Sequence, residues 1–312
     1  MTESGALPIA SSAHDLTRRR NRHRHESVIR FLLFTCAAAS IFTSAAIIFT
    51  LAKEAIAFFQ IVPFFDFLFG TEWTPTFNPK QFGVLPLICG TLWIVIGSSL
   101  VAIPVGLASA IYLSEFATPR ARKILKPTLE VLAGIPTVVY GFFALTFVTP
   151  LLRVVFPSTE INNAASASIV VGIMILPMVA SLCDDALRAV PSSLRQGAYA
   201  LGSTSYEAST RVVVPAALSG IVASFVLALS RAVGETMAVT LAAGNTPNIT
   251  ANPLEQIQTM TAYIVQISQG DVEHGDTAYQ TLFAVAGLLF TITLISNVLS
   301  HRILKRFREV YE

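Results

Sequence analysis

The sequence predicts an all-α membrane protein with six transmembrane helices. Hydrophobic residues make up 53% of the 312 residues and charged residues only 13%, and the mean hydropathy is +0.64. Soluble domains carry about 25% charged residues. A backbone inside hydrocarbon must satisfy its own hydrogen bonds, so long apolar segments are expected to be helices. We expect these helices at about residues 29–52, 83–113, 127–149, 165–183, 216–243 and 280–300.

The first predicted helix follows a polar, basic tail, residues 1–27, which we expect to be disordered. Its RRRNRHRH run (18–25) is also compatible with a nucleic-acid-binding arm, a histidine metal site or a targeting signal. The apolar stretch from Phe31 to Ala52 is about 33 Å long as a helix, enough to cross a bilayer. No A-x-A-like cleavage site follows a short core, so this helix is predicted to remain as an anchor.

The positions of the basic residues predict how the chain is oriented. If both termini are cytoplasmic, 17 of the 21 Lys and Arg residues fall in cytoplasmic segments. Only Lys53, Lys80 and Arg153 are then external, and Arg231 alone lies within a predicted helix. Because basic residues accumulate on the cytoplasmic side of membrane proteins, both termini are predicted to be cytoplasmic.

Two external segments follow from this orientation. Residues 54–82 are rich in Phe and contain Trp73. They are expected either to lie along the membrane interface or to pack on the helix bundle. Residues 244–279 are polar and acidic, and we expect a partner protein to dock there.

Four further residues near the membrane are expected to be structural. Glu130 follows Pro127 and is predicted in the first turn of the third helix, where the helix dipole stabilises a carboxylate. Cys36, Cys89 and Cys183 form no C-x-x-C pair and are interpreted as packing residues. No metal-binding cluster or catalytic constellation is predicted.

Two short helices joined by a turn are predicted within residues 184–215, between the fourth and fifth membrane helices. Gly202 is suited to end the first of them. Thr204 and Glu207 then have the T-x-x-E spacing of a capping box, which starts the second.

An apolar stripe along the first short helix suggests a contact with another protein. Leu194, Ala198 and Leu201 follow one another at helical spacing and fit a groove on a partner. The alternative is a loop that folds back on its own bundle. DNA binding is disfavoured, because the segment has few basic residues and both its ends are held at the membrane.

This segment resembles the cytoplasmic loop of ATP-binding cassette (ABC) importer permeases, whose signature is E-A-A, three residues, Gly, nine residues and I-x-L-P. The corresponding residues here are Gln196-Gly197-Ala198, Gly202 and Val212-x-Val214-Pro215. The spacings match, but Gln196 replaces the Glu and so removes any ion pair made by that Glu. The resemblance implies the type I importer permease fold, with a coupling helix-turn-helix that docks on an ATP-binding subunit. The residues assigned to this coupling loop are Arg195, Gln196, Gly197, Ala198, Gly202, Glu207 and Pro215.

The chain has no G-x-x-x-x-G-K-[ST] sequence and no Gly-Lys pair, so it is not expected to cradle ATP by that route. The resemblance places ATP and Mg²⁺ on partner subunits. No cofactor is assigned to this chain, and no enzymatic activity of its own is predicted.

A charge pair is predicted at membrane depth in the fifth helix. Arg231 and Glu235 are four residues apart and therefore share one helix face. Such groups usually face an aqueous path, although a self-neutralising structural pair is the alternative. The planar guanidinium of Arg suits a tetrahedral oxyanion, and Glu235 would accept a hydrogen bond from protonated phosphate but not from sulfate. The residues assigned to the substrate path are Arg231, Glu235, Thr236, Thr240 and Asn245.

Three segments narrow the resemblance to phosphate importer permeases of the PstC type: 132–145, 188–202 and 231–248. The similarity extends from about Gly83 to His301. It implies a subunit that translocates inorganic phosphate across the plasma membrane of a prokaryote. The implied partners are a PstA-type permease, two ATP-binding subunits, an external phosphate-binding protein and membrane lipid, without nucleic acid.

The chain is accordingly divided into four parts. These are the basic tail (1–27), the first helix with its external loop (28–82), the core permease domain (83–301) and a cytoplasmic C-terminal tail (302–312). The alternative functions are a permease for another oxyanion such as sulfate, molybdate or phosphonate, an ion-coupled transporter or channel, and a membrane-embedded enzyme.

Overall fold

The computed structural model describes residues 12–270 and 275–307. For residues 12–27, 301 and 303–307 this description is limited to the backbone. The chain forms two compact units, Met1–Lys53 and Glu54–Glu312. Residues 1–11 of the predicted basic tail and 308–312 of the predicted C-terminal tail lie outside the described residues.

Six membrane-crossing segments are present among the described residues. Five helical segments are long and apolar enough to cross a membrane, namely Val28–Ile61, Leu85–Phe116, Thr137–Val155, Ala164–Arg188 and Thr277–Ser300. A sixth meets the same criterion only as a pair of helices, Ser205–Ala216 and Leu218–Val233, which are bent by 69° relative to one another. The predicted all-α class with six spans is therefore confirmed, although the boundaries of the first, third and fifth helices differ from the prediction.

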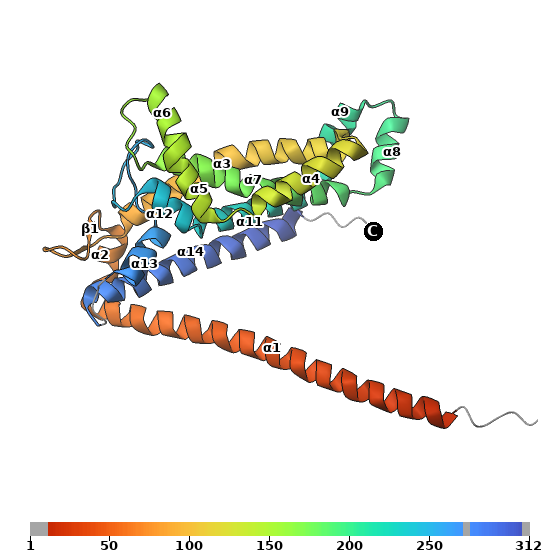
Figure 1. Ribbon diagram of the computed structural model, residues 1–312, viewed down its shortest axis with the longest axis horizontal. Coiled ribbons are helices and arrows are strands. Elements are labelled where there is room, and N and C mark those ends of the chain that lie inside the picture. The colour runs from red at the N-terminus through yellow and green to blue at the C-terminus, as the bar shows by residue number, and fades with distance from the viewer. Residues whose placement is uncertain (1–11, 271–274, 308–312) are drawn as a thin grey trace, which may run out of the picture. The chain divides into compact units, whose positions relative to one another are not determined.

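Helix α1 (Ser12–Ile61) contains the first span and continues nine residues beyond its predicted end at 52 (Figure 1). No Pro or Gly interrupts the chain before Pro63, so nothing in the sequence ends the helix earlier. Its span, Val28–Ile61, is strongly apolar, which suits a hydrocarbon environment.

The Phe-rich segment after α1 packs in part on the bundle, which confirms one of the two predicted alternatives. It forms α2 (Phe64–Phe69) and a hairpin of β1 (Trp73–Thr74) and β2 (Gln81–Phe82). Phe58 and Phe67 are buried against one another and against the side chain of Trp73. In contrast, the side chains of Phe64, Phe65 and Phe69 are exposed. One face of the segment therefore packs on the bundle, and the other presents aromatic rings.

Two long helices form the centre of the bundle. Their bounds are α3 (Leu85–Ile111), which continues into the π-helical turn η2 (Tyr112–Phe116), and α7 (Ala164–Arg188). They approach closely at glycines, as is common between membrane helices. A Cβ atom at Gly172 would lie 2.7 Å from the Cβ of Val101, and one at Gly97 would lie 2.5 Å from the Oγ of Ser168. Only Gly fits these positions without a shift of the neighbouring helix.

The predicted third helix, 127–149, is wrong at both ends. The chain forms α4 (Pro119–Ala133), then α5 (Thr137–Phe143), η3 (Ala144–Val148) and α6 (Thr149–Val155). Pro136 explains the break, because proline disfavours helical geometry in the residue before it and lacks an amide donor. Glu130 consequently lies in the last turn of α4 and not in the first turn of a span.

The predicted fifth helix, 216–243, is also wrong as a single helix. The chain from 192 to 243 instead forms α8 (Ser192–Ala200), α9 (Ser205–Ala208), η4 (Ser209–Val213), α10 (Val214–Ala216), α11 (Leu218–Val233) and α12 (Met237–Ala243). The last three elements correspond to the predicted fifth helix. Breaks at Ala217 and at Gly234–Thr236 separate its three pieces. Helix α13 (Met260–Gln269) and the long α14 (Thr277–Phe307) complete the described chain.

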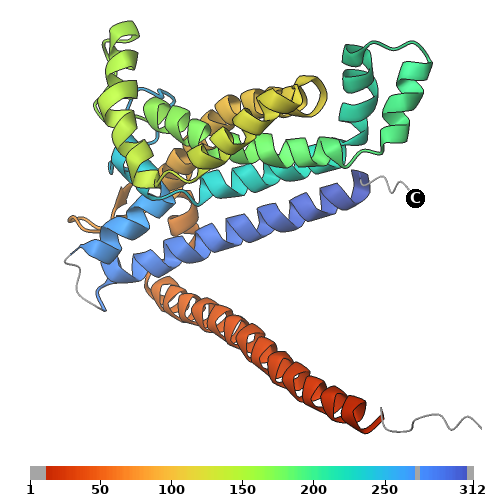
Figure 2. The ribbon, with the colours of Figure 1, turned by 45° about the vertical axis from the view of Figure 1, so that its right-hand side comes forward.

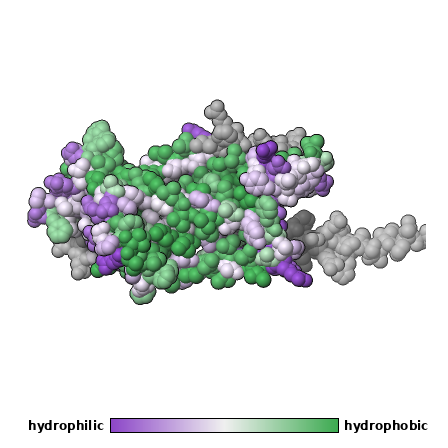
Figure 3. Space-filling model, turned by 90° about the horizontal axis from the view of Figure 1, so that it is seen from above, coloured by the Kyte–Doolittle hydropathy of each residue, from purple (hydrophilic) through white to green (hydrophobic). Residues whose placement is uncertain are grey.

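Within the second unit, the two ends of the bundle differ in character. Figure 1 shows α8, α9 and the start of α4 at one end, and α2, β1 and α6 at the opposite end. Helices α11 and α14 run side by side between them (Figure 2). The face seen in Figure 3 is apolar in its middle and hydrophilic at its ends. This pattern is expected of a bundle that crosses a membrane.

Candidate functional site

The candidate site is centred on the break between α11 and α12. Helix α11 ends at Val233 and α12 begins at Met237. The Glu235 carboxylate accepts a hydrogen bond from the amide of Ala238 at 3.3 Å, and the hydroxyl of Thr261 donates to the Glu235 carbonyl at 2.8 Å. The Glu235 carboxylate thus satisfies a backbone amide in the first turn of α12. The prediction that Arg231 and Glu235 share the face of one continuous helix is therefore wrong.

Arg231 and Glu235 nevertheless remain close. The Arg231 Nη2 lies 3.8 Å from the Glu235 Oε2, an ion pair too long for a hydrogen bond. Each charge also suits its own helix end, because α11 ends with the cation and α12 begins with the anion. The two side chains differ in burial, with 4% of Glu235 and 48% of Arg231 exposed. The guanidinium is thus the accessible member of the pair.

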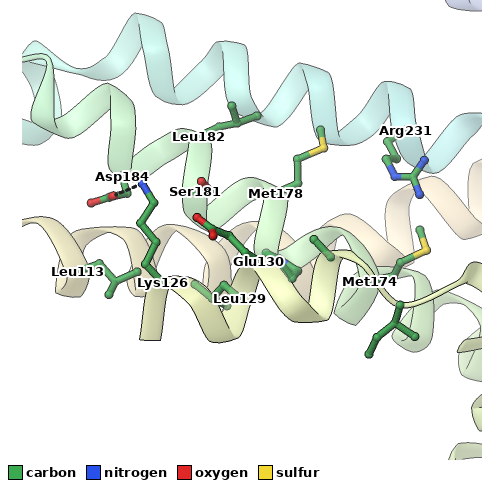
Figure 4. A pocket seen from close by; sticks show the side chains of 13 residues that line it. Leu113, Lys126, Leu129, Glu130, Met174, Met178, Ser181, Leu182, Asp184 and Arg231 are labelled. Carbon is green, nitrogen blue, oxygen red and sulfur yellow. Dashed lines mark ion pairs between the residues drawn. The ribbon is translucent and has the colours of Figure 1, made fainter. Parts of the chain in front are cut away.

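Arg231 lines a cavity of about 410 Å³ between α4, α7 and α11 (Figure 4). The residues around it are Leu113, Lys126, Leu129, Glu130, Ala133, Ile135, Met174, Pro177, Met178, Ser181, Leu182, Asp184 and Arg231. Figure 4 shows Arg231 at one end and Lys126 with Asp184 at the other, with Glu130 between them. Its charged lining groups are two cations, Arg231 and Lys126, and two carboxylates, Glu130 and Asp184, set in mostly apolar walls.

A charge network holds α4 against α7 at the Lys126 end. Asp184 is buried, and its Oδ2 lies 2.5 Å from the Arg122 Nη2 and 3.6 Å from the Lys126 Nζ. Arg188 lies 3.6 Å from the other carboxylate oxygen, and Lys126 also contacts Asp185 at 3.3 Å. Of these five groups only Lys126 and Asp184 line the cavity, so this end pairs one cation with one carboxylate.

The other predicted path residues lie away from this cavity. The Thr236 hydroxyl donates to the Gly234 carbonyl at 3.1 Å, and the Thr240 hydroxyl donates to the Thr236 carbonyl at 2.8 Å. Asn245 is exposed beyond the end of α12. The structure thus brings Arg231 together with Glu235 and leaves these three polar residues outside the cavity lining.

Sequence reasoning missed Lys126 and Glu130 as cavity residues. Both belong to α4. The predicted membrane helix, 127–149, contains Glu130, whereas Lys126 falls in the predicted cytoplasmic segment before it. The break at Pro136 was the available signal that α4 is a separate, amphipathic helix.

The predicted helix-turn-helix is present at one end of the bundle. The Thr204 hydroxyl accepts from the Glu207 amide at 3.3 Å, and the Glu207 carboxylate accepts from the Thr204 amide at 3.0 Å. This confirms the capping box. Gly202 ends α8 with a φ of 84°, which glycine adopts without strain.

The predicted apolar stripe on α8 does not form a single outward face. Leu194 packs against the core and Ala198 is buried, whereas Leu201 is 89% exposed. We call the outward face of this segment the tip surface; it consists of Gln196, Gly197, Tyr199, Leu201, Gly202 and Tyr206, all of which are exposed. Pro215 is exposed in α10. Arg195 turns inward and forms an ion pair with Glu115 at 3.0 Å.

Comparisons with known proteins agree with this architecture. Residues 102–309 match the model of the family described as binding-protein-dependent transport system inner membrane component. The probable ABC transporter permease protein YqgH of Bacillus subtilis is 35% identical, with 95% of this chain and 96% of the relative covered. The phosphate transport system permease protein PstC of Mesorhizobium japonicum is 30% identical, with 96% of each chain covered.

A solved structure supports the fold. One chain of the MetNI methionine ABC transporter in an inward-facing conformation superposes with a TM-score of 0.55 at 17% identity, covering 73% of this chain and 95% of the other. The family match spans the cavity, the helix break and the tip surface. The chain therefore belongs to the family of binding-protein-dependent transport system inner membrane components, as a multi-pass ABC transporter permease.

Proposed function

We propose that this chain is the membrane permease subunit of an ATP-driven importer of inorganic phosphate. The observation that carries the proposal is the accessible Arg231 guanidinium in a membrane cavity of about 410 Å³. A planar fork of N–H donors matches the oxygens of a tetrahedral anion two at a time. The similarity to phosphate transport system permeases supports phosphate as that anion.

The proposed path runs through the cavity from Arg231 towards Lys126. Apolar walls strengthen the attraction between an anion and these cations, because they exclude water. Glu235 is buried, and one of its carboxylate oxygens already accepts from the Ala238 amide. Its proposed role is therefore to orient Arg231 and to accept a hydrogen bond from protonated phosphate, which sulfate does not offer. Thr236, Thr240 and Asn245 are proposed to serve the path only if the helix break rearranges during transport.

The proposed assembly pairs this chain with a PstA-type permease, two ATP-binding subunits and an external phosphate-binding protein. ATP and Mg²⁺ belong to the ATP-binding subunits, which contact the tip surface, and both termini of this chain are cytoplasmic. Basic side chains at the end of the bundle that carries α8 support this orientation. Transport then follows alternating access, in which nucleotide binding favours one facing state of the permeases over the other.

Replacement of Arg231 tests the proposal. In the complete complex reconstituted into vesicles, we expect Arg231→Gln to lower phosphate uptake at least about tenfold, because it loses charge-assisted hydrogen bonds worth about 1.5–3 kcal/mol. We expect Arg231→Lys to retain part of the uptake, since Lys keeps the charge without the fork. The matched control is Arg120→Gln, which removes an exposed cation of α4 outside the cavity lining.

The measurement is ATP-dependent uptake of labelled phosphate, with unlabelled sulfate or molybdate as competitors. Phosphate uptake at the wild-type rate by the Arg231→Gln complex would show that Arg231 is not part of the substrate path. Competition by sulfate at the concentration at which phosphate competes contradicts phosphate selectivity. Uptake by this chain without ATP or partner subunits supports a channel instead.

A further inference from the structure

The side chain of Arg195 joins three parts of the bundle at the base of α8. Its guanidinium contacts both carboxylate oxygens of Glu115, with Nη2 to Oε1 at 3.0 Å and Nε to Oε2 at 3.3 Å. It also donates to the carbonyls of Leu187 and Val190, each at 2.7 Å. A single side chain thus links α8, the end of α7 and the turn η2 that continues α3.

This linkage is shielded from solvent. Only 7% of the Glu115 side chain and 20% of the Arg195 side chain are exposed. The hydroxyl of Ser114 donates a further hydrogen bond to Glu115 at 2.8 Å. A bidentate, largely buried Arg–carboxylate pair has a defined geometry, so relative movement of its two helices would break several charge-assisted hydrogen bonds together.

The position of the pair relative to the tip surface gives it a mechanical role. Gln196 and Gly197 directly follow Arg195 on α8 and are exposed, whereas the Arg195 side chain points inward to Glu115. A partner that displaces the tip surface therefore displaces the guanidinium. Because Glu115 belongs to η2, the displacement reaches α3, which packs against α7 at the centre of the bundle.

We propose that the Arg195–Glu115 ion pair transmits movement of the tip surface to the membrane helices α3 and α7. Arg195 is thus a positioning residue that acts inside the permease and does not itself contact the ATP-binding subunit. This inference rests on the proposed function as an ATP-driven importer. It adds Glu115, a residue outside the coupling loop, to the coupling machinery.

The test measures phosphate transported per ATP hydrolysed by the complete complex in vesicles. We expect Arg195→Met to lower this ratio about tenfold, within the usual range of coupling free energies, while ATP hydrolysis continues. Glu115→Gln is expected to act in the same direction, and Arg195→Lys to be intermediate, because Lys cannot reach all three acceptors. The matched control Arg120→Met removes an exposed cation in the first turn of α4, outside the network around Asp184, and is expected to leave the ratio unchanged.

A double substitution shows whether Arg195 and Glu115 act together as one ion pair or contribute to coupling independently. If the pair acts as one unit, Arg195→Met combined with Glu115→Gln lowers the ratio no further than the stronger single change. Additive losses overturn the proposal, as does an unchanged ratio in assembled variants. Loss of complex assembly by both Arg195→Lys and Glu115→Gln also overturns it, because the pair would then only hold the loop in shape. A wild-type complex that hydrolyses ATP but imports no phosphate contradicts the proposed function instead.

Discussion

Asp184 shows how one buried carboxylate determines the shape of the candidate site. Its side chain is 1% exposed and lies between Arg122, Lys126 and Arg188. Without this carboxylate, Arg122 and Lys126 on α4 would repel each other and would repel Arg188 on α7. Because α4 has no buried residue of its own, this ionic contact is a main determinant of its position beside the cavity.

We expect Asp184→Ala to destabilise the protein by about 3 kcal/mol, because it leaves partly buried cations without their partner. The matched control is Asp185→Ala, whose side chain is 61% exposed and whose loss is expected to cost less than about 0.5 kcal/mol. The measurement is the thermal unfolding of the two purified variants in detergent. Equal unfolding temperatures for both variants would show that the network does not support α4.

At the level of single residues, the sequence predicted which residues lie near each other better than it predicted what surrounds them. Four-residue spacing correctly indicated that Arg231 and Glu235 lie near each other, since even a broken helix keeps the chain short between them. The cavity around Arg231 depends on how α4 packs across α7, and no local pattern encodes that packing. For the same reason, the sequence places Arg195 in the coupling loop but does not show its acceptors, which lie on η2, on α7 and at Val190.

At the level of elements, the close contact between α3 and α7 depends on the absence of side chains. We expect Gly172→Leu to destabilise the protein by about 1–3 kcal/mol, because its side chain would overlap Val101. The control is Gly287→Ala in α14, where the nearest side-chain atom is 3.9 Å from the new Cβ and helix propensity gains up to about 1 kcal/mol. Thermal unfolding in detergent measures both. An unchanged unfolding temperature for Gly172→Leu would mean that α3 and α7 can move apart without a loss of stability.

Hydropathy predicted the existence of the elements but not their breaks. Long apolar runs have one favourable backbone solution in a membrane, so six spans were predictable. The breaks at Pro136 and at Gly234–Thr236 interrupt runs that remain apolar on both sides. Their polar backbone groups are satisfied by distant side chains, such as Thr261 on the Glu235 carbonyl, which a linear reading does not contain.

At the level of the whole molecule, the distribution of charge should fix the orientation of the bundle. Basic side chains on α4 and α8 lie at one end, and the hairpin of β1 and β2 lies at the other. The positive-inside rule therefore places Lys123, which is exposed on α4, in the cytoplasm and Phe77, which is 71% exposed between the two strands, outside.

Labelling of introduced cysteines tests this orientation in a variant whose native Cys36, Cys89 and Cys183 are replaced by Ala. A thiol reagent that does not cross membranes is expected to label Phe77→Cys in intact cells, but Lys123→Cys only after permeabilisation. The cysteine-free parent is the control for background, and permeabilised cells establish that both thiols react. Labelling of Lys123→Cys in intact cells would show that the bundle has the opposite orientation in the membrane. It would then place the tip surface on the side of the membrane that lacks ATP, so no ATP-binding subunit could drive transport through it.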